Sequence, residues 1–270
     1  MAEAEDFSGS GPLAEALMRE GFAAGLSACL AQKLQALNMP ERTLFVARLH
    51  QLAASRNLAD RAGFRHLANS FALPYGLQQI HPGACVPACC EFLLLTRTPA
   101  TYAGMYCDWL GPGRTRLPDG SEVLQAAADA RPETRMPAVF QASLLARFAR
   151  LSPAKGLAQD FLTRGKIWSE ATHLLEAVFP GQLQYLALAR TFADAGAELN
   201  RLLNQGKQLL LFRQDHACVL TAVNPDRRGN LYYQYFDPAT VNRESTGLPG
   251  PAEMPLAALR QDLTNLILIA

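Results

Sequence analysis

Apolar positions in the first third of the chain recur every three or four residues, which is the spacing of amphipathic helices. The pattern covers residues 13–37 and resumes over residues 44–52, after Pro40. The first 70 residues therefore predict a helical N-terminal module. An acidic tail of small residues at positions 1–12 precedes these helices and is expected to be disordered.

A segment rich in proline and glycine follows, and we expect a second domain that begins with it and covers residues 71–270. Residues 71–83 predict a loop, and the apolar run at residues 85–95 predicts a buried helix. A turn-rich connector at residues 111–120 leads to two more predicted helices, at residues 122–130 and 137–151. The first part of this domain is therefore expected to be mostly helical.

Strand-like patterns dominate after Gly181. Residues 182–188 alternate in part like a strand, and residues 192–204 predict a helix closed by Gly206. Three further strands are expected at residues 207–213, 216–224 and 231–236, with hairpin-turn residues at 225–229. A loop pattern at 244–255 precedes a segment, 256–269, that starts helical and ends apolar. Helices first and antiparallel strands last predict an α+β fold.

Charge and composition exclude several classes of protein. The 25 Lys and Arg residues nearly balance 24 Asp and Glu residues, so a nucleic-acid-binding surface is not expected. No segment reaches the ~20 apolar residues of a membrane helix, and the N-terminus has neither the basic start nor the apolar stretch of a signal peptide. We expect a soluble protein of a reducing cytoplasm, or one exported by a route that uses no cleaved signal.

The cysteines are expected to be free thiols, because they are scattered over a chain much larger than a disulfide-stabilised miniprotein. They are Cys29, Cys85, Cys89, Cys90, Cys107 and Cys218. A histidine, His81, lies close in sequence to three of them, but no second CxxC or HxxxH motif completes a four-ligand zinc site. No metal and no cofactor is therefore expected.

Cys85 is placed like a catalytic nucleophile. It follows the Pro82-Gly83 break and begins the predicted buried helix, and a helix N-terminus lowers the pKa of a thiol by stabilising the thiolate. Pro87 fits the first turn of a helix, where its missing N–H is tolerated. The alternative is that Cys85, Cys89 and Cys90 are three small core residues at helical spacing.

A histidine and an aspartate lie where one predicted hairpin brings them together. His216 opens one strand and Asp237 ends the next, and the sum of their numbers, 453, centres the hairpin between Asp226 and Arg227. Directly opposed residues point to the same face of a sheet, so the imidazole and the carboxylate are expected to be neighbours. The alternative is a surface histidine beside a turn-initiating Asp-Pro sequence.

Thiol attack on a carbonyl also requires hydrogen-bond donors for the oxyanion that forms. Gln79 lies six positions before Cys85 and is the candidate side-chain donor. The adjacent Gln78 is a second candidate, and both are otherwise ordinary loop glutamines.

These motifs resemble those of the papain-like cysteine peptidase superfamily. Its members carry a glutamine ahead of a helix-borne cysteine, then a strand-borne histidine and a following Asp or Asn, in the order of Gln79, Cys85, His216 and Asp237. Within the superfamily, Gly-Ala-Cys, His-Ala and Phe-Asp-Pro are similar to the motifs of bacterial effector peptidases of the YopT and AvrPphB group. The resemblance implies a papain-like fold, a Cys-His-Asp triad and a bacterial effector that acts on proteins of a host or competitor cell.

Three functions remain open at this stage. The first is hydrolysis of a protein or peptide amide through a thioester, with the N-terminal helices recognising a partner or the substrate. The second is glutamine deamidation or acyl transfer by the same triad, which can also attack a side-chain carboxamide. The third is a binding protein that keeps the fold without turnover.

Overall fold

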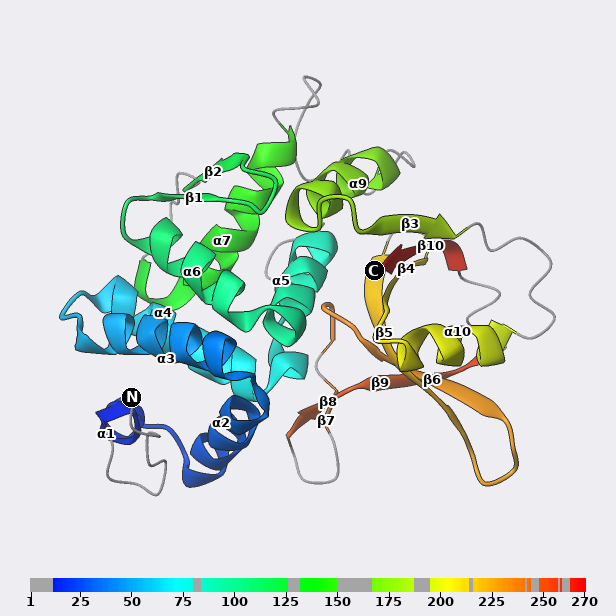
Figure 1. Cartoon of the computed structure of the whole chain (residues 1–270), viewed down its shortest axis with the longest axis horizontal. Coiled ribbons are helices and arrows are strands. Elements are labelled where there is room, and N and C mark those ends of the chain that lie inside the picture. Colours follow the sequence, from blue (N-terminus) through cyan, green and yellow to red (C-terminus); the bar gives the residue numbers. More distant parts are fainter. Residues whose placement is uncertain are drawn as a thin grey trace.

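The computed structural model describes residues 12–79, 84–125, 132–149, 167–186, 195–213, 216–240, 242–243, 248–256, 258 and 263–270. Helices form one half of the molecule and an antiparallel sheet forms most of the other (Figure 1). The predicted α+β class is therefore confirmed. Within the described ranges, every helix is too short or too polar to cross a membrane.

The helical half begins with four helices joined by short loops. They are α1 (Pro12–Arg19), α2 (Ala24–Ala36), α3 (Met39–Ala54) and α4 (Leu58–Ala72). Gly21 adopts a left-handed conformation with φ +76°, which favours glycine, so the predicted helix at 13–37 is divided in two. Asn38 and Asn57 cap α3 and α4 by accepting hydrogen bonds from backbone N–H groups.

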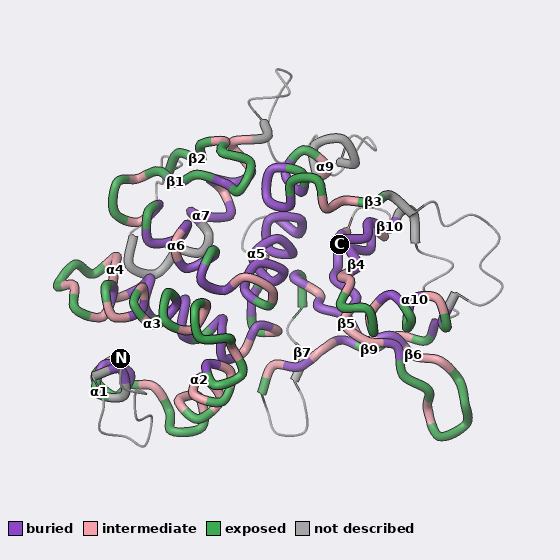
Figure 2. Tube along the Cα trace, viewed as in Figure 1, coloured by how far each residue is buried: buried purple, intermediate pink, exposed green. Residues whose placement is uncertain are grey.

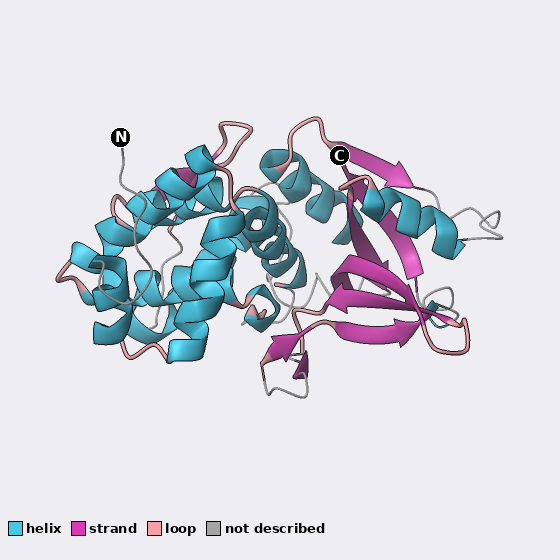
Figure 3. Ribbon diagram, turned by 60° about the horizontal axis from the view of Figure 1, so that its bottom comes forward, coloured by secondary structure: helices cyan, strands magenta, loops and turns pink. Residues whose placement is uncertain are grey.

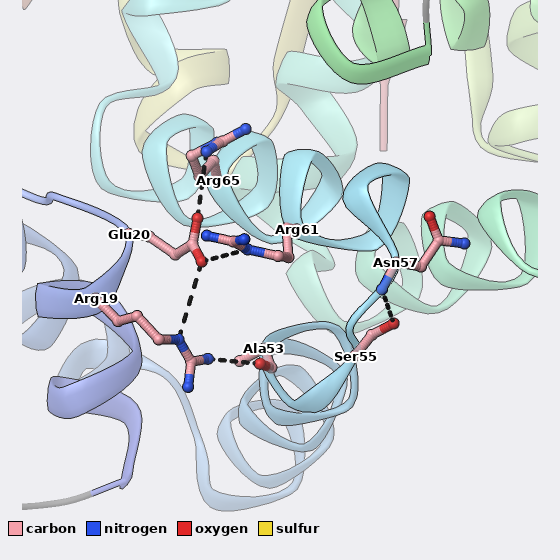
Figure 4. Close-up of polar contacts among 7 residues, drawn as sticks. All are labelled: Arg19, Glu20, Ala53, Ser55, Asn57, Arg61 and Arg65. Atoms are coloured by element: carbon pink, nitrogen blue, oxygen red, sulfur yellow. Dashed lines mark hydrogen bonds and ion pairs between the residues drawn. The ribbon is translucent and has the colours of Figure 1, made fainter.

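Polar contacts fix the end of α1 against α4 (Figure 4). The Glu20 carboxylate is only 2% exposed and accepts hydrogen bonds from Arg61 at 2.8 Å and Arg65 at 3.2 Å. Arg19 donates to the carbonyl of Ala53 near the end of α3. Three of the four helices are thus joined by side chains as well as by their apolar faces.

The rest of the helical half surrounds one buried helix. A 3₁₀ turn, η1 (Pro74–Gly76), leads to α5 (Cys85–Arg97), α6 (Pro99–Leu110), α7 (Pro132–Ala149) and α9 (Ile167–Val178). Every residue of α5 from Cys85 to Leu95 is buried (Figure 2). Apolar side chains of α1 to α4 belong to the same continuous core as α5. Whether residues 1–70 also form a separate module stays a prediction.

The main sheet has six antiparallel strands in the order β3-β10-β4-β5-β6-β9. They are β3 (Leu183–Leu186), β4 (Gln208–Arg213), β5 (His216–Pro225), β6 (Leu231–Phe236), β9 (Ala252–Pro255) and β10 (Leu263–Ile269). The helix α10 (Ala195–Asn204) precedes β4. Two small ribbons pair β1 (Arg114–Arg116) with β2 (Glu122–Leu124) and β7 (Asn242–Arg243) with β8 (Pro249–Gly250).

Helices lie on both sides of the main sheet (Figure 3), and alternation along the strands gives the sheet two buried faces. One face includes Ala217, Val219 and Phe236 and packs on α5, where Phe236 stacks on Phe92 with ring centroids 4.3 Å apart. The other face packs on α10 through a second apolar cluster. Because α5 lies between the helices and the sheet, its N-terminus is held by both halves of the molecule.

Several predicted elements are wrong or only partly described. Residues 122–124, predicted as the start of a helix, form β2, because they pair with β1. Residues 252–255 form a strand instead of a loop. Residues 263–269, for which the sequence predicted only an apolar end, form a strand between β3 and β4. The tail at 1–11, most of the helix predicted at 122–130 and the start of the helix predicted at 192–204 lie outside the described residues.

Candidate active site

The predicted nucleophile lies at the beginning of α5. Cys85 is the first residue of the helix and is 5% exposed, so the prediction that it opens a buried helix is confirmed. The preceding Ala84 makes no side-chain cap, and Pro87 occupies the first turn. The first turn of α5 therefore keeps backbone N–H groups without a side-chain cap next to Cys85.

The hairpin of β5 and β6 has a different register from the predicted one. Val219 pairs with Phe236 and Leu220 with Tyr235, and a bulge at Thr221 shifts the register of the following pairs by one residue. The turn is centred near Arg228, so the prediction that His216 and Asp237 are directly opposed is wrong. A bulge adds one residue to one strand of a ladder, and an alternating pattern does not reveal it.

The histidine and the aspartate are nevertheless side-chain neighbours, as predicted. The Nε2 atom of His216 lies 2.8 Å from Oδ1 of Asp237, and the two side chains are 22% and 13% exposed. The same Asp237 oxygen accepts a hydrogen bond from the backbone N–H of Ala239 at 2.9 Å. Asp237 follows the last residue of β6, so this local turn aims its carboxylate back at the start of β5.

His216 also interacts with two thiols. Burial lowers the pKa of His216, but hydrogen bonds with the side chains of Asp237, Cys218 and Cys85 outweigh burial and raise it. Burial raises the pKa of Asp237, and hydrogen bonds from His216 and Ala239 outweigh it, so the pKa lies below its ordinary value. The structure therefore brings Cys85, His216 and Asp237 together, with the imidazole held in its charged form by a carboxylate.

The predicted oxyanion donor is tied to the same turn. The backbone N–H of Gln79 donates to the carbonyl of Pro238 at 2.8 Å, which holds the loop before α5 next to Asp237. The Gln79 side chain is half-buried, and its Oε1 atom has no hydrogen-bond partner among the described residues. The Gln78 side chain is exposed, and the Gln78 carbonyl accepts from Gln141. Gln79 is therefore the better placed of the two glutamines.

Other cysteines near the site have the properties of core residues. The Cys89 thiol donates to the carbonyl of Ala217 at 3.4 Å, which joins α5 to β5. Burial raises the pKa of Cys89 and of Cys90, and it raises the pKa of Cys107 to about 12. These thiols stay protonated and unreactive near neutral pH.

Cys218 is a neighbour of the histidine that the sequence analysis missed. It lies two residues after His216 on β5, and positions two apart in a strand share a face. Ligand atoms of His216, Cys218 and Asp237 all lie within 4.8 Å of one another. The His-x-Cys spacing on a predicted strand was the signal that could have found it. His81, the histidine of the cysteine cluster considered for zinc, lies outside the described residues.

A buried polar network supports the loop that carries Gln79. Glu91 on α5 is fully buried and accepts hydrogen bonds from the Tyr102 hydroxyl at 2.6 Å and the Gln141 amide at 2.7 Å. The same Gln141 amide donates to the carbonyl of Gln78 at 2.8 Å. The tyrosine hydroxyl also lies 3.0 Å from Nε2 of His66 on α4. Four helices and the loop before the nucleophile are thereby connected.

No protein-family model matches the chain, and neither the curated proteins nor the solved structures include a significant match.

Proposed function

We propose that the chain is a cysteine hydrolase with a papain-like arrangement, which cleaves a protein or peptide amide through a thioester on Cys85. The observation that carries the proposal is the environment of His216. It is hydrogen-bonded to the Asp237 carboxylate and to the thiol at the N-terminus of a buried helix. Cys85 and His216 are 131 residues apart in sequence (216 − 85), so only the tertiary fold brings them together.

The proposed reaction follows from these contacts. Cys85 and His216 form a thiolate–imidazolium pair, in which the thiol proton resides on His216 and Asp237 orients and stabilises the imidazolium. The thiolate attacks the carbonyl carbon, and the C–N bond breaks as His216 gives its proton to the leaving amine. Water then attacks the thioester and loses a proton to His216, which releases the acid and restores the thiol.

The charge that develops on the substrate oxygen needs donors already in position. We assign this role to the backbone N–H of Cys85 at the uncapped helix start and to the side-chain amide of Gln79. The hydrogen bond from Gln79 N–H to Pro238 keeps this loop beside the triad, and the Glu91 network anchors the residue before it. Preorganised donors of this kind are usually the largest single contribution to such catalysis.

The resemblance to bacterial effector peptidases extends the proposal to a protein substrate in a host or competitor cell, with the first 70 residues recognising a partner. Product analysis separates this reaction from its chemical alternatives. A new peptide N-terminus identifies hydrolysis, whereas a glutamine-to-glutamate change or an amine adduct identifies deamidation or acyl transfer. Failure of Cys85 to react with an electrophile would identify a binding protein without turnover.

The first test is the reactivity of the thiols toward limiting iodoacetamide. We expect Cys85 to be labelled before Cys29, although Cys85 is 5% exposed and Cys29 is half-exposed on α2. His216→Ala should slow labelling of Cys85 and leave Cys29 unchanged, because only Cys85 depends on the imidazole. Faster labelling of Cys29 that ignores the histidine would refute the assignment.

The second test compares three variants on a library of quenched fluorescent peptides. Cys85→Ala and His216→Ala should each lower kcat by on the order of 10⁶-fold, and Asp237→Ala by less, on the order of 10⁴-fold. Circular dichroism of each variant controls for folding. A larger loss for Asp237→Ala than for the other two, with the fold intact, would give the carboxylate a direct chemical role and contradict the proposed triad.

A further inference from the structure

Three unlike metal-ligand groups meet where β5 begins. The imidazole of His216, the thiol of Cys218 and the carboxylate of Asp237 place one ligand atom each within 4.8 Å of the other two. The Nε2 atom of His216 lies 2.8 Å from Oδ1 of Asp237. The thiol of Cys218 is hydrogen-bonded to the same histidine. A hydrolase triad uses one thiol, so Cys218 has no part in the proposed reaction.

The chemistry of this group is specific. Thiolate, imidazole and carboxylate together favour a borderline-soft divalent cation, of which Zn²⁺ is the typical case, over Mg²⁺ or Ca²⁺. Zinc lies about 2.0–2.3 Å from such ligand atoms, so neighbouring ligands of a tetrahedral site are about 3.3–3.8 Å apart. The histidine and aspartate atoms are 2.8 Å apart, and the other ligand atoms of the group are at most 4.8 Å apart, so the ligand–ligand distances of a tetrahedral zinc site lie between these two limits.

Burial and charge also suit an ion. Cys218 is fully buried, whereas the side chains of His216 and Asp237 are 22% and 13% exposed, so the imidazole and the carboxylate are in contact with solvent. One thiolate and one carboxylate neutralise a divalent cation, which avoids a net charge in a half-buried position. The thiol proton of Cys218 and the imidazolium proton of His216 are both released to solvent when the ion binds.

We propose that His216, Cys218 and Asp237 bind Zn²⁺, and that the bound ion blocks the thiol chemistry of Cys85. Three protein ligands leave a fourth position open to water, which is the pattern of a functional site and not of a closed structural one. The ion coordinates the histidine and the carboxylate on which Cys85 depends. Binding stands on the geometry alone, whereas the block rests on the proposed function.

Binding is tested with Co²⁺, which replaces Zn²⁺ and gives a thiolate charge-transfer absorption. The Cys85→Ala protein is used, so the proposed nucleophile cannot contribute to the signal. We expect one equivalent of Co²⁺ to produce the band and Zn²⁺ to remove it. Adding Cys218→Ser should abolish the band and weaken Zn²⁺ affinity, measured by calorimetry, by at least about tenfold.

The matched control adds Cys107→Ser, which removes another buried thiol from α6 and should leave the band unchanged. His216→Gln is a second, independent test in case Cys218→Ser loses binding only because it disturbs packing. It should also lose Zn²⁺ binding. Absence of the band in the Cys85→Ala protein, or equal Zn²⁺ affinity with and without Cys218 and His216, would overturn the site.

The block is tested in the wild-type protein by the rate at which iodoacetamide labels Cys85. Zn²⁺ should slow this rate at least about tenfold, EDTA should restore it, and Cys218→Ser should make it insensitive to Zn²⁺. Binding of Zn²⁺ without slower labelling would overturn the block. A Cys85 that is unreactive even with EDTA would instead refute the proposed hydrolase, and the Co²⁺ result would still decide the metal site.

Discussion

The buried hydroxyl of Tyr102 allows a sharp test of how much the internal polar network stabilises the fold. It donates to Glu91 at 2.6 Å and lies 3.0 Å from Nε2 of His66. Tyr102→Phe keeps the ring and removes only these contacts. A buried polar group left without its partner costs about 1–3 kcal/mol. We expect a loss of about 1–2 kcal/mol, in the lower part of this range, because Glu91 keeps its bond from Gln141.

Tyr106, one turn further along α6, is the matched control. It is equally buried, but its hydroxyl has no hydrogen-bond partner among the described residues. Tyr106→Phe should therefore be neutral or slightly stabilising. Urea denaturation of both variants, followed by circular dichroism, gives the two free energies of unfolding. If Tyr106→Phe were as destabilising as Tyr102→Phe, the ring edges and not the hydrogen bonds would account for the loss, and the reasoning would be refuted.

Three further predictions concern the helical half. A chain that starts at Asn69 should be insoluble or molten in circular dichroism and ANS binding, because α1 to α4 share a core with α5; a soluble, cooperatively folding product would contradict this. Gly104→Ala should raise the free energy of unfolding by about 0.5–1 kcal/mol. Gly63→Ala should raise it less or lower it, because the added Cβ atom would lie 2.4 Å from Cδ1 of Leu110 on α6. Glu20→Ala should lower the free energy of unfolding by about 1–2 kcal/mol, because it removes a buried acceptor from Arg61 and Arg65 of α4. Glu198→Ala, which removes the exposed ion pair with Arg201 in α10, should leave the urea midpoint unchanged. Equal shifts of the midpoint in the two variants would contradict this.

The sequence carries the local determinants of the candidate site well. Pro82, Gly83 and Pro87 mark the start of the helix at Cys85, and hairpin-turn residues join the strand of His216 to that of Asp237. These features act over a few residues, so they can be interpreted without the fold. The hydrogen bond between Gln79 and Pro238 joins distant segments and leaves no periodic signal.

The sequence pattern fails where tertiary contacts decide the secondary structure or the strand register. The apolar residues 263–269 fit a buried helix or a buried strand equally well by pattern. Pairing with β3 on one side and β4 on the other makes them a strand. The hairpin register depends on a bulge at Thr221, whose hydroxyl donates to the carbonyl of Gln234. Cys218 is one of six thiols scattered along the sequence, and its position two residues after His216 on a strand is what places it beside the histidine.

The position of β10 has a consequence for the order of folding. This strand comes after the other strands of the main sheet in sequence, yet it lies between β3 and β4. Until residues 263–269 arrive, the edge of β4 presents the unpaired backbone of Leu209 to Phe212, which is an aggregation-prone template. Such long-range pairing is slow. A nascent chain that pairs β4 with β5 before β10 is made therefore exposes this edge throughout synthesis of β6 and β9.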